Sequence, residues 1–168
     1  MYLSERYISD ADADEIKNIV DGIAKDSPKP EWYSSTIGGD DFHLMPRQEE
    51  LDDIIDHYEH ILGRELQLLN AWSVYGDEGN FHLVHRHHKF PKYICTVLFL
   101  DTEGVQSPHG DFYAVLNNNV YQFSPQKGDL LIFSSDVCHG TYPQVKGLRQ
   151  TLNMDFRNLG QRNVSRKV

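Results

Sequence analysis

One short stretch of the chain is rich in histidine, with four of the nine histidines inside seven consecutive positions. If this stretch is an extended strand, its side chains alternate between two faces, so His85 and His87 share one face. Phe81 and Leu83 lie on that same face, which predicts that it points to the interior. Two inward histidines at i and i+2 can reach one metal ion. The outward face is expected to carry His82, Val84, Arg86 and His88, with no role in metal binding.

A third histidine and an arginine follow much later in the chain. His139 comes after the apolar run 129–133 and a short loop, and it is the candidate for a third ligand. Imidazole suits Fe, Zn, Cu and Ni alike, so three histidines do not name the metal. An inward Arg149 beside a hydroxyl residue can hold a carboxylate through two parallel hydrogen bonds. Alternation over 149–156 places Arg149, Thr151, Asn153 and Asp155 on one face and Gln150, Leu152, Met154 and Phe156 on the other.

Two helices are expected before residue 64. Ser9 or Asp10 is suited to begin the first helix, which runs to about Lys25. The segment 26–46 carries Pro28, Pro30, Gly38 and Gly39 and is predicted to be a loop. A second helix begins near Arg47 and ends at Gly63. The apolar stripes at helical spacing are Ile16, Ile19, Val20 and Ile23 in the first helix and Leu51, Ile54, Ile55, Tyr58, Ile61 and Leu62 in the second.

From residue 64 onward the pattern is that of short strands separated by turns rich in glycine, proline and asparagine. Many short strands with regular turns favour a β-sandwich or barrel. The chain is therefore expected to be a single, mainly β domain with N-terminal helices, of the α+β class. A helical support region would span 1–63, a β core 64–157 and a tail 158–168. The expected strands are 65–75, 81–87, 92–100, 111–116, 119–124, 129–134, 140–143 and 148–156.

Length and charge narrow the function classes. A chain of 168 residues fits one domain. It carries 16 Lys plus Arg against 25 Asp plus Glu, and this net charge of −9 disfavours nucleic acid as a partner, because phosphate contacts need clustered basic side chains. No apolar stretch approaches the roughly 18–20 residues that cross a bilayer, so no membrane partner is expected. Cys95 and Cys138 lack a disulfide or metal spacing and no signal peptide is visible, which predicts a cytoplasmic protein.

The order of these motifs resembles that of the 2-oxoglutarate- and Fe(II)-dependent dioxygenases, in particular the prolyl-hydroxylase-like and small bacterial or phage-type members. The resemblance covers about residues 70–157. It is most specific in the second half, where a Pro-x-x-Gly-Asp turn, an apolar strand ending in phenylalanine, a histidine and an arginine ten residues later follow the family's order. The matching positions are 75, 79, 85, 87, 93–101, 110–112, 125–133, 139–140, 143 and 147–151.

The resemblance implies a double-stranded β-helix, or jelly roll, with Fe(II) at one mouth. It also implies 2-oxoglutarate as cosubstrate and O2 as oxidant, with succinate and CO2 released as a substrate C–H bond is hydroxylated. The substrate would be a small molecule or a peptide, and the prolyl-hydroxylase-like spacing favours an amino-acid or prolyl peptide. Together with the histidines identified above, the expected site residues are His85, His87 and His139 for the metal, and Arg149, Thr151, Tyr75 and Tyr93 for the cosubstrate.

The match departs from the family at one position. The usual first motif is His-x-Asp or His-x-Glu, whereas this chain has His85-Arg86-His87. A neutral imidazole in place of a carboxylate leaves the iron one negative charge short. Three explanations stay open. His87 is the third ligand, or a carboxylate such as Asp111 or Asp101 fills the position, or the position is vacant and the protein is weakly active or inactive.

Two other functions also stay open. A three-histidine oxygenase of the cupin type, working without a 2-oxo acid, would explain His87 and leave Arg149 to bind a substrate carboxylate. Stoichiometric succinate would separate the two enzymes. A catalytically degenerate jelly roll would bind a ligand without turnover, since fold alone does not fix function. A nucleic-acid demethylase is disfavoured, because that group carries a second arginine soon after the clamp, whereas Arg157 comes eight residues after Arg149.

Overall fold

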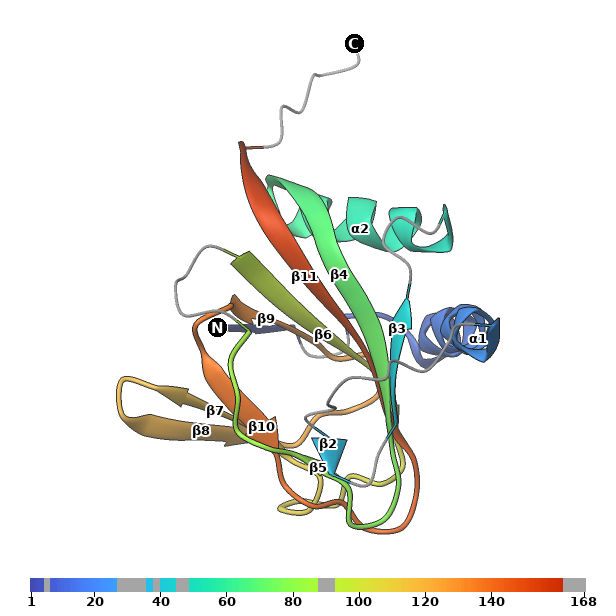
Figure 1. Cartoon of the computed structure of the whole chain (residues 1–168), viewed down its shortest axis with the longest axis vertical. Helices are drawn as coiled ribbons and strands as arrows, with labels where there is room; N and C mark the ends of the chain where they lie inside the picture. The colour runs from blue at the N-terminus through green and yellow to red at the C-terminus, as the bar shows by residue number, and fades with distance from the viewer. Residues whose placement is uncertain (5–6, 27–35, 38–39, 45–48, 88–92, 162–168) are drawn as a thin grey trace.

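The structure is a computed structural model that describes residues 1–4, 7–26, 36–37, 40–44, 49–87 and 93–161 (Figure 1). Its two helices are α1 (Asp10–Asp26) and α2 (Glu49–Leu62). The predicted class, mainly β with N-terminal helices, is confirmed. The strands are β1 (Tyr2–Ser4), β2 (Thr36–Ile37), β3 (Asp40–Leu44), β4 (Arg64–Gly76), β5 (Phe81–His82), β6 (Tyr93–Thr102), β7 (Phe112–Leu116), β8 (Asn119–Phe123), β9 (Leu130–Ser134), β10 (Cys138–Thr141) and β11 (Arg149–Gln161).

A large antiparallel sheet of six strands carries most of the core. Its strand order is β1-β9-β6-β11-β4-β3, and a three-stranded sheet has the order β10-β7-β8. Strands β2 and β5 form a separate pair. Figure 1 shows α1 and α2 on one side of the long strands β4 and β11, with β7, β8 and β10 on the other side. The large sheet is therefore covered on both faces.

Alternating side chains on the large sheet build two separate cores. On β6, Leu98 and Leu100 belong to a buried cluster that includes Val20 of α1 and Tyr58 of α2. Their neighbours Val97 and Phe99 belong to a second buried cluster, which includes residues of β7 and β9. Each face of the central strands thus has its own apolar layer, and the second layer lies between the large sheet and the small sheet.

The helices begin and end as the sequence predicts. At the start of α1 the Ser9 hydroxyl accepts a hydrogen bond from the Asp12 backbone N–H at 3.2 Å and donates to the Asp12 carboxylate at 2.7 Å. Gly63 follows α2 with a φ of 59°, a left-handed conformation that glycine adopts without a Cβ penalty. Ile61 is the exception in the predicted apolar stripe, because it is 38% exposed.

Outside the predicted β core 64–157, three expectations about strands are wrong. The predicted loop 26–46 contains β2 and β3, and β3 pairs antiparallel with β4. Strand β1, which was not expected, pairs with β9, and β11 continues into the predicted tail as far as Gln161. These segments become strands because a neighbouring strand offers free backbone groups, a cause that lies outside their own sequence. In the described part of the chain, no helix combines the length and apolar character needed to cross a membrane.

Candidate metal centre

A cavity between the two sheets collects most of the predicted site residues. Its walls come from β4, β6 and β11 of the large sheet, from β7 and β10 of the small sheet, and from the segment that follows β5. The apolar part of the lining includes Val97, Phe99 and Phe112. The polar part of the lining includes His82, His85, His87, His139, Arg149 and Thr151.

Backbone pairing places the histidine-rich segment against β10. The predicted strand 81–87 is wrong beyond His82, because the chain leaves β5 there and touches β10 at a single bridge. At this bridge His85 and His139 exchange two backbone hydrogen bonds, each 2.9 Å long. The His87 N–H then donates to the Ser135 carbonyl at 3.1 Å. Leu83 is 40% exposed, so the expected inward apolar face does not form around it.

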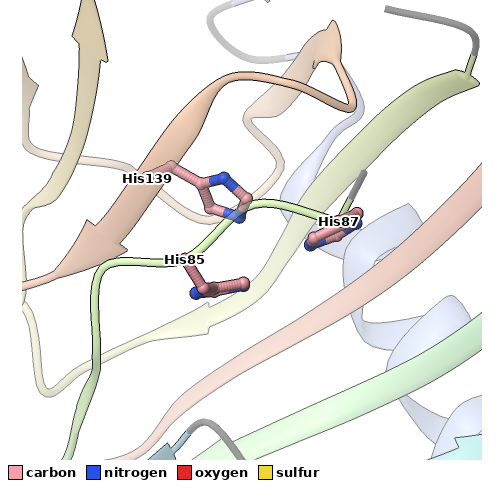
Figure 2. A group of neighbouring side chains, drawn as sticks. All are labelled: His85, His87 and His139. Carbon is pink, nitrogen blue, oxygen red and sulfur yellow. The ribbon is translucent and has the colours of Figure 1, made fainter. Parts of the chain in front are cut away.

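The imidazoles of His85, His87 and His139 nevertheless meet (Figure 2). One nitrogen of each ring lies within 4.8 Å of the others. Small side-chain adjustments would bring three such nitrogens to roughly 2.0–2.1 Å from one ion, a distance typical of imidazole ligands. The structure thus assembles the three residues that the sequence named as candidate metal ligands.

Backbone carbonyls orient two of these rings. The Nδ1 atom of His85 lies 2.7 Å from the Leu83 carbonyl oxygen, and Nδ1 of His139 lies 3.0 Å from the Val137 carbonyl oxygen. Because a carbonyl only accepts, Nδ1 carries the proton in both rings and Nε2 keeps its lone pair. This is the tautomer that a metal ligand needs. Burial, followed by the nearby His85 and His87, also holds the pKa of His139 well below its usual value, so His139 stays neutral.

The third ring is oriented by a side chain from another element. Nδ1 of His87 lies 2.7 Å from Oδ1 of Asp155 on β11 and 3.2 Å from the sulfur of Cys95 on β6. The carboxylate accepts the Nδ1 proton, which again leaves Nε2 for a metal. The Cys95 thiol is buried, and burial, together with Asp155, raises its pKa, so it stays protonated. Sequence alternation had placed Asp155 on the inward face of its strand but had not assigned it a role.

His82 lies in the cavity, and its predicted outward position is wrong. Its backbone N–H donates to the Thr141 hydroxyl at 2.9 Å, and its ring centroid is 5.6 Å from that of His85. Burial, followed by the charges of His85 and Arg149, lowers the pKa of His82 to about 3. His82 therefore presents a neutral imidazole to the cavity. His88, predicted to share its face, lies outside the described residues.

Arg149 brings a buried positive charge into the same cavity. Its side chain is 2% exposed, and its Nη1 donates to the Gly110 carbonyl at a long 3.5 Å. Burial lowers its pKa to about 10, which leaves it charged at neutral pH. No acidic side chain among the described residues pairs with this guanidinium. A buried cation without a counter-ion is costly, so this end of the cavity is built for an anion.

Thr151 stands next to Arg149 on the same face of β11. Its hydroxyl oxygen accepts a hydrogen bond from the Asn153 amide at 3.0 Å, which leaves its own proton free to donate into the cavity. The alternation predicted for this strand is confirmed. Leu152, Met154 and Phe156 lie in the helix-side core, while Thr151 and Asn153 line the cavity.

The two carboxylates proposed to replace His87 lie elsewhere. Asp111 is buried, and its Oδ2 accepts hydrogen bonds from the Ser107 hydroxyl at 2.7 Å and from the Gln122 amide at 2.8 Å. Asp101 accepts the backbone N–H of Glu103 at 3.1 Å. Neither belongs to a group of side chains that could hold a metal within the described ranges.

The two tyrosines predicted to contact a cosubstrate do not line the cavity. Trp72 and Val74 of β4 face the cavity, so Tyr75 points to the opposite face, where its hydroxyl donates to Asp21 of α1 at 2.6 Å. Burial acts to raise the pKa of Asp21, but hydrogen bonds from Lys17, Tyr75 and Gln150 outweigh it and lower the pKa. Tyr93 begins β6 at a distance from the cavity lining. Tyr75 is thus part of the contact between the sheet and α1.

Comparison with known proteins rests on structure. No protein-family model and no curated protein sequence matches the chain. A prolyl-4-hydroxylase from Pseudomonas putida superposes with a TM-score of 0.69 at 20% identity, over 93% of this chain and 91% of that one. A Trichoplax adhaerens prolyl hydroxylase, solved with a hypoxia inducible factor peptide, gives 0.73 at 10% identity, over 94% and 83%. The chain has the fold of the prolyl hydroxylases.

The prolyl-hydroxylase fold also occurs in a protein solved with a different set of ligands. HygX from Streptomyces hygroscopicus, solved with nickel, 2-oxoglutarate and hygromycin B, gives a TM-score of 0.72 at 11% identity, over 92% of this chain and 81% of that one. At these identities the likeness concerns the fold. It confirms, at that level, the resemblance that the motifs predicted between residues 70 and 157.

Proposed function

We propose that this chain is an Fe(II)- and 2-oxoglutarate-dependent dioxygenase that hydroxylates a C–H bond of a peptide or small-molecule substrate. One observation carries the proposal. Three imidazoles whose Nδ1 atoms lie against hydrogen-bond acceptors face the same cavity as a buried guanidinium that pairs with no acidic side chain among the described residues. The first group suits a divalent metal ion and the second suits a carboxylate, and 2-oxoglutarate is a molecule that needs both.

The architecture supports a double-stranded β-helix as the finer description of the fold. Two antiparallel sheets face each other across an apolar layer, with helices on the outer face of the larger sheet. In such a fold the site lies between the sheets, and this is where the cavity is found. The similar solved structures, one with a bound peptide and one with bound 2-oxoglutarate, support this assignment.

The residues have separate tasks in this proposal. His85, His87 and His139 hold Fe(II), and Arg149 with Thr151 holds the far carboxylate of 2-oxoglutarate. Bound Fe(II) supplies the chemistry that couples decarboxylation of 2-oxoglutarate by O2 to hydroxylation of the substrate.

The apolar side chains of Val97, Phe99 and Phe112 line the same cavity as the buried arginine. Apolar surroundings of low polarity strengthen the attraction between a guanidinium and a carboxylate.

The three imidazoles also favour a second candidate, a three-histidine oxygenase without a 2-oxo acid. In that enzyme Arg149 would bind a carboxylate of the substrate itself. We favour the first function because the deep position of Arg149 beside Thr151 suits a small dicarboxylate better than one end of a larger substrate. On this fold, one similar structure was solved with a peptide and another with hygromycin B, so both substrate classes fit the proposal.

The test adds Fe(II) and then 2-oxoglutarate to the metal-free protein in the absence of O2. The expected result is the visible charge-transfer absorption of a chelated 2-oxo acid, present in the wild type and lost in His87→Ala and His139→Ala. Tyr75→Phe is the matched control, because its hydroxyl contacts Asp21 on the opposite face of the sheet. Fe(II) binding without this absorption would point to the three-histidine oxygenase, and no Fe(II) binding would point to a binding protein.

A further inference from the structure

Asp155 of β11 lies next to the candidate metal centre and contacts one of its three histidines. Its carboxylate lies 2.7 Å from Nδ1 of His87, and its side chain is 18% exposed against 13% for His87. The register of the large sheet puts Asp155 beside Cys95 of β6. The contact therefore joins the last strand to the histidine segment across 68 residues of sequence.

The contact changes what His87 offers to a metal. An imidazole whose Nδ1 proton is held by a carboxylate is a more basic ligand at Nε2 than one held by a backbone carbonyl. Nδ1 of His85 and Nδ1 of His139 each lie against a backbone carbonyl oxygen. His87 is thus a candidate ligand supported by a full negative charge.

The charges around the candidate metal centre suggest what the contact between Asp155 and His87 does. Three neutral imidazoles leave a divalent ion without an anionic protein ligand, while the buried Arg149 adds a further positive charge to the cavity. The carboxylate of Asp155 is separated from the metal position only by the ring of His87. It returns one negative charge at that distance, where it attracts the ion without occupying a coordination position.

We propose that Asp155 is the positioning residue of the metal centre, which orients His87 through Nδ1 and supplies the negative charge that the three-histidine ligand set lacks. This inference rests on the proposed metal site and adds a residue to it. It differs from a second arrangement that the side chains allow, in which His87, Cys95 and Asp155 themselves would hold an ion. In that arrangement Nδ1 of His87 would face the metal and Nε2 would face the cavity.

The experiment measures Co(II) affinity in the absence of 2-oxoglutarate, by competition with a chromophoric chelator. Asp155→Asn keeps an oxygen that accepts the Nδ1 proton but removes the charge, whereas Asp155→Ala removes both. We expect Co(II) binding about 10-fold weaker in the first variant and about 100-fold weaker in the second, the range found for partners of metal-bound histidines. Cys95→Ser is the matched control, because its side chain touches the same nitrogen.

Two further readings separate this role from a merely structural one. The melting temperature of the metal-free variants shows whether the fold has suffered, and a Co(II) affinity that tracks this temperature would overturn the inference. Absorption from sulfur-to-cobalt charge transfer would also overturn it, because it would show Cys95 as a ligand. Trp72, whose ring centroid is 5.3 Å from that of His87, provides a fluorescence signal that Co(II) bound at the three histidines quenches.

The outcomes distinguish this inference from the proposed function. A wild-type protein that binds no Co(II) would remove the metal centre and both proposals with it. A wild type that binds Co(II) as tightly as Asp155→Asn and Asp155→Ala would overturn the role of Asp155 and leave the proposed oxygenase standing. Weaker binding in both variants supports the role of Asp155 even if 2-oxoglutarate proves not to bind.

Discussion

The two faces of β11 differ as much as any two regions of this molecule. On the helix side, Leu152, Met154 and Phe156 are completely buried in one apolar cluster. On the cavity side, Arg149 and Thr151 are nearly as buried but polar. Adjacent residues of β11 thus lie alternately in an apolar core and in a polar cavity.

The helix side of β11 stabilises the fold, whereas the cavity side destabilises it. Apolar burial on the helix side is favourable at roughly 25 cal/mol per Å2. Burial of a guanidinium without a counter-ion on the cavity side is unfavourable. One strand can combine apolar burial on one face with a buried guanidinium on the other if a ligand binds on the cavity side. The predictions below test this division between the two faces of β11, and the substitutions run from the largest expected effect to the smallest.

The largest effect is expected on the helix side. Phe156→Ala removes a fully buried ring that packs edge-on against Tyr58 at a centroid distance of 6.1 Å. The free energy of unfolding should fall by about 3–5 kcal/mol, measured by chemical denaturation. Binding of Co(II) and 2-oxoglutarate, assayed well below the new melting temperature, should be unchanged. A variant that stays fully stable would show that the division between the faces is misplaced.

The cavity side should respond in the opposite way. Arg149→Met removes a buried charge that has no acidic partner among the described residues, so the melting temperature of the ligand-free protein should stay the same or rise. The binding free energy of 2-oxoglutarate should weaken by about 2–5 kcal/mol, measured by calorimetry with Co(II) present. Arg149→Lys keeps the charge without the paired donors and should lie between. Unchanged cosubstrate affinity in Arg149→Met would reject the clamp.

A smaller effect is expected at the neighbouring hydroxyl. Thr151→Val keeps the shape of the side chain and removes one hydrogen bond, so affinity for 2-oxoglutarate should fall by about 1 kcal/mol, or roughly fivefold. Thr141→Val is the matched control, because that hydroxyl already accepts the backbone N–H of His82. Equal losses in the two variants would argue against a specific role for Thr151.

The last effect concerns pH, and it develops gradually rather than through a single substitution. Burial lowers the pKa of His82 from 6.5 to about 3. Between pH 6.5 and pH 3 the imidazole is therefore protonated in the unfolded chain and neutral in the folded protein. Stability is therefore complete above about pH 6.5 and decreases as the pH falls, by no more than about 1.4 kcal/mol per unit for this group. Denaturation of the metal-free protein between pH 7.5 and 5 should show this slope. His82→Gln should make it shallower, and an identical slope would contradict the assignment.

The sequence predicted the parts whose cause is local. Both helices follow from periodic apolar residues and from Ser9 and Gly63 at their ends, and the inward face of β11 follows from strict alternation. The paired strands β1 and β3 were missed, because an edge strand is defined by its neighbour. His82 was misplaced because the chain stops being a strand immediately after it, a break that no turn residue announces.

The candidate site was predicted in the same uneven way. His85, His87, His139 and Arg149 stood out by residue type and spacing, and the structure brings them to one cavity. The contact between His87 and Asp155 was not visible, because it joins positions 68 residues apart and depends on how two elements pack. Tyr75 was predicted to contact the cosubstrate, but the structure turns Trp72 and Val74 of β4 to the cavity and so places Tyr75 on the opposite face.

The hydrogen bonds that orient the imidazoles of His85, His87 and His139 have a consequence for the evolution of this protein. His85 and His139 rest on carbonyl groups two residues earlier in the backbone, which persist whatever side chains occur at those positions. His87 rests on a side chain, which a single codon change can remove. Inherited variation can therefore tune one ligand while the other two keep their orientation. Lineages that differ in metal preference should differ first at position 155.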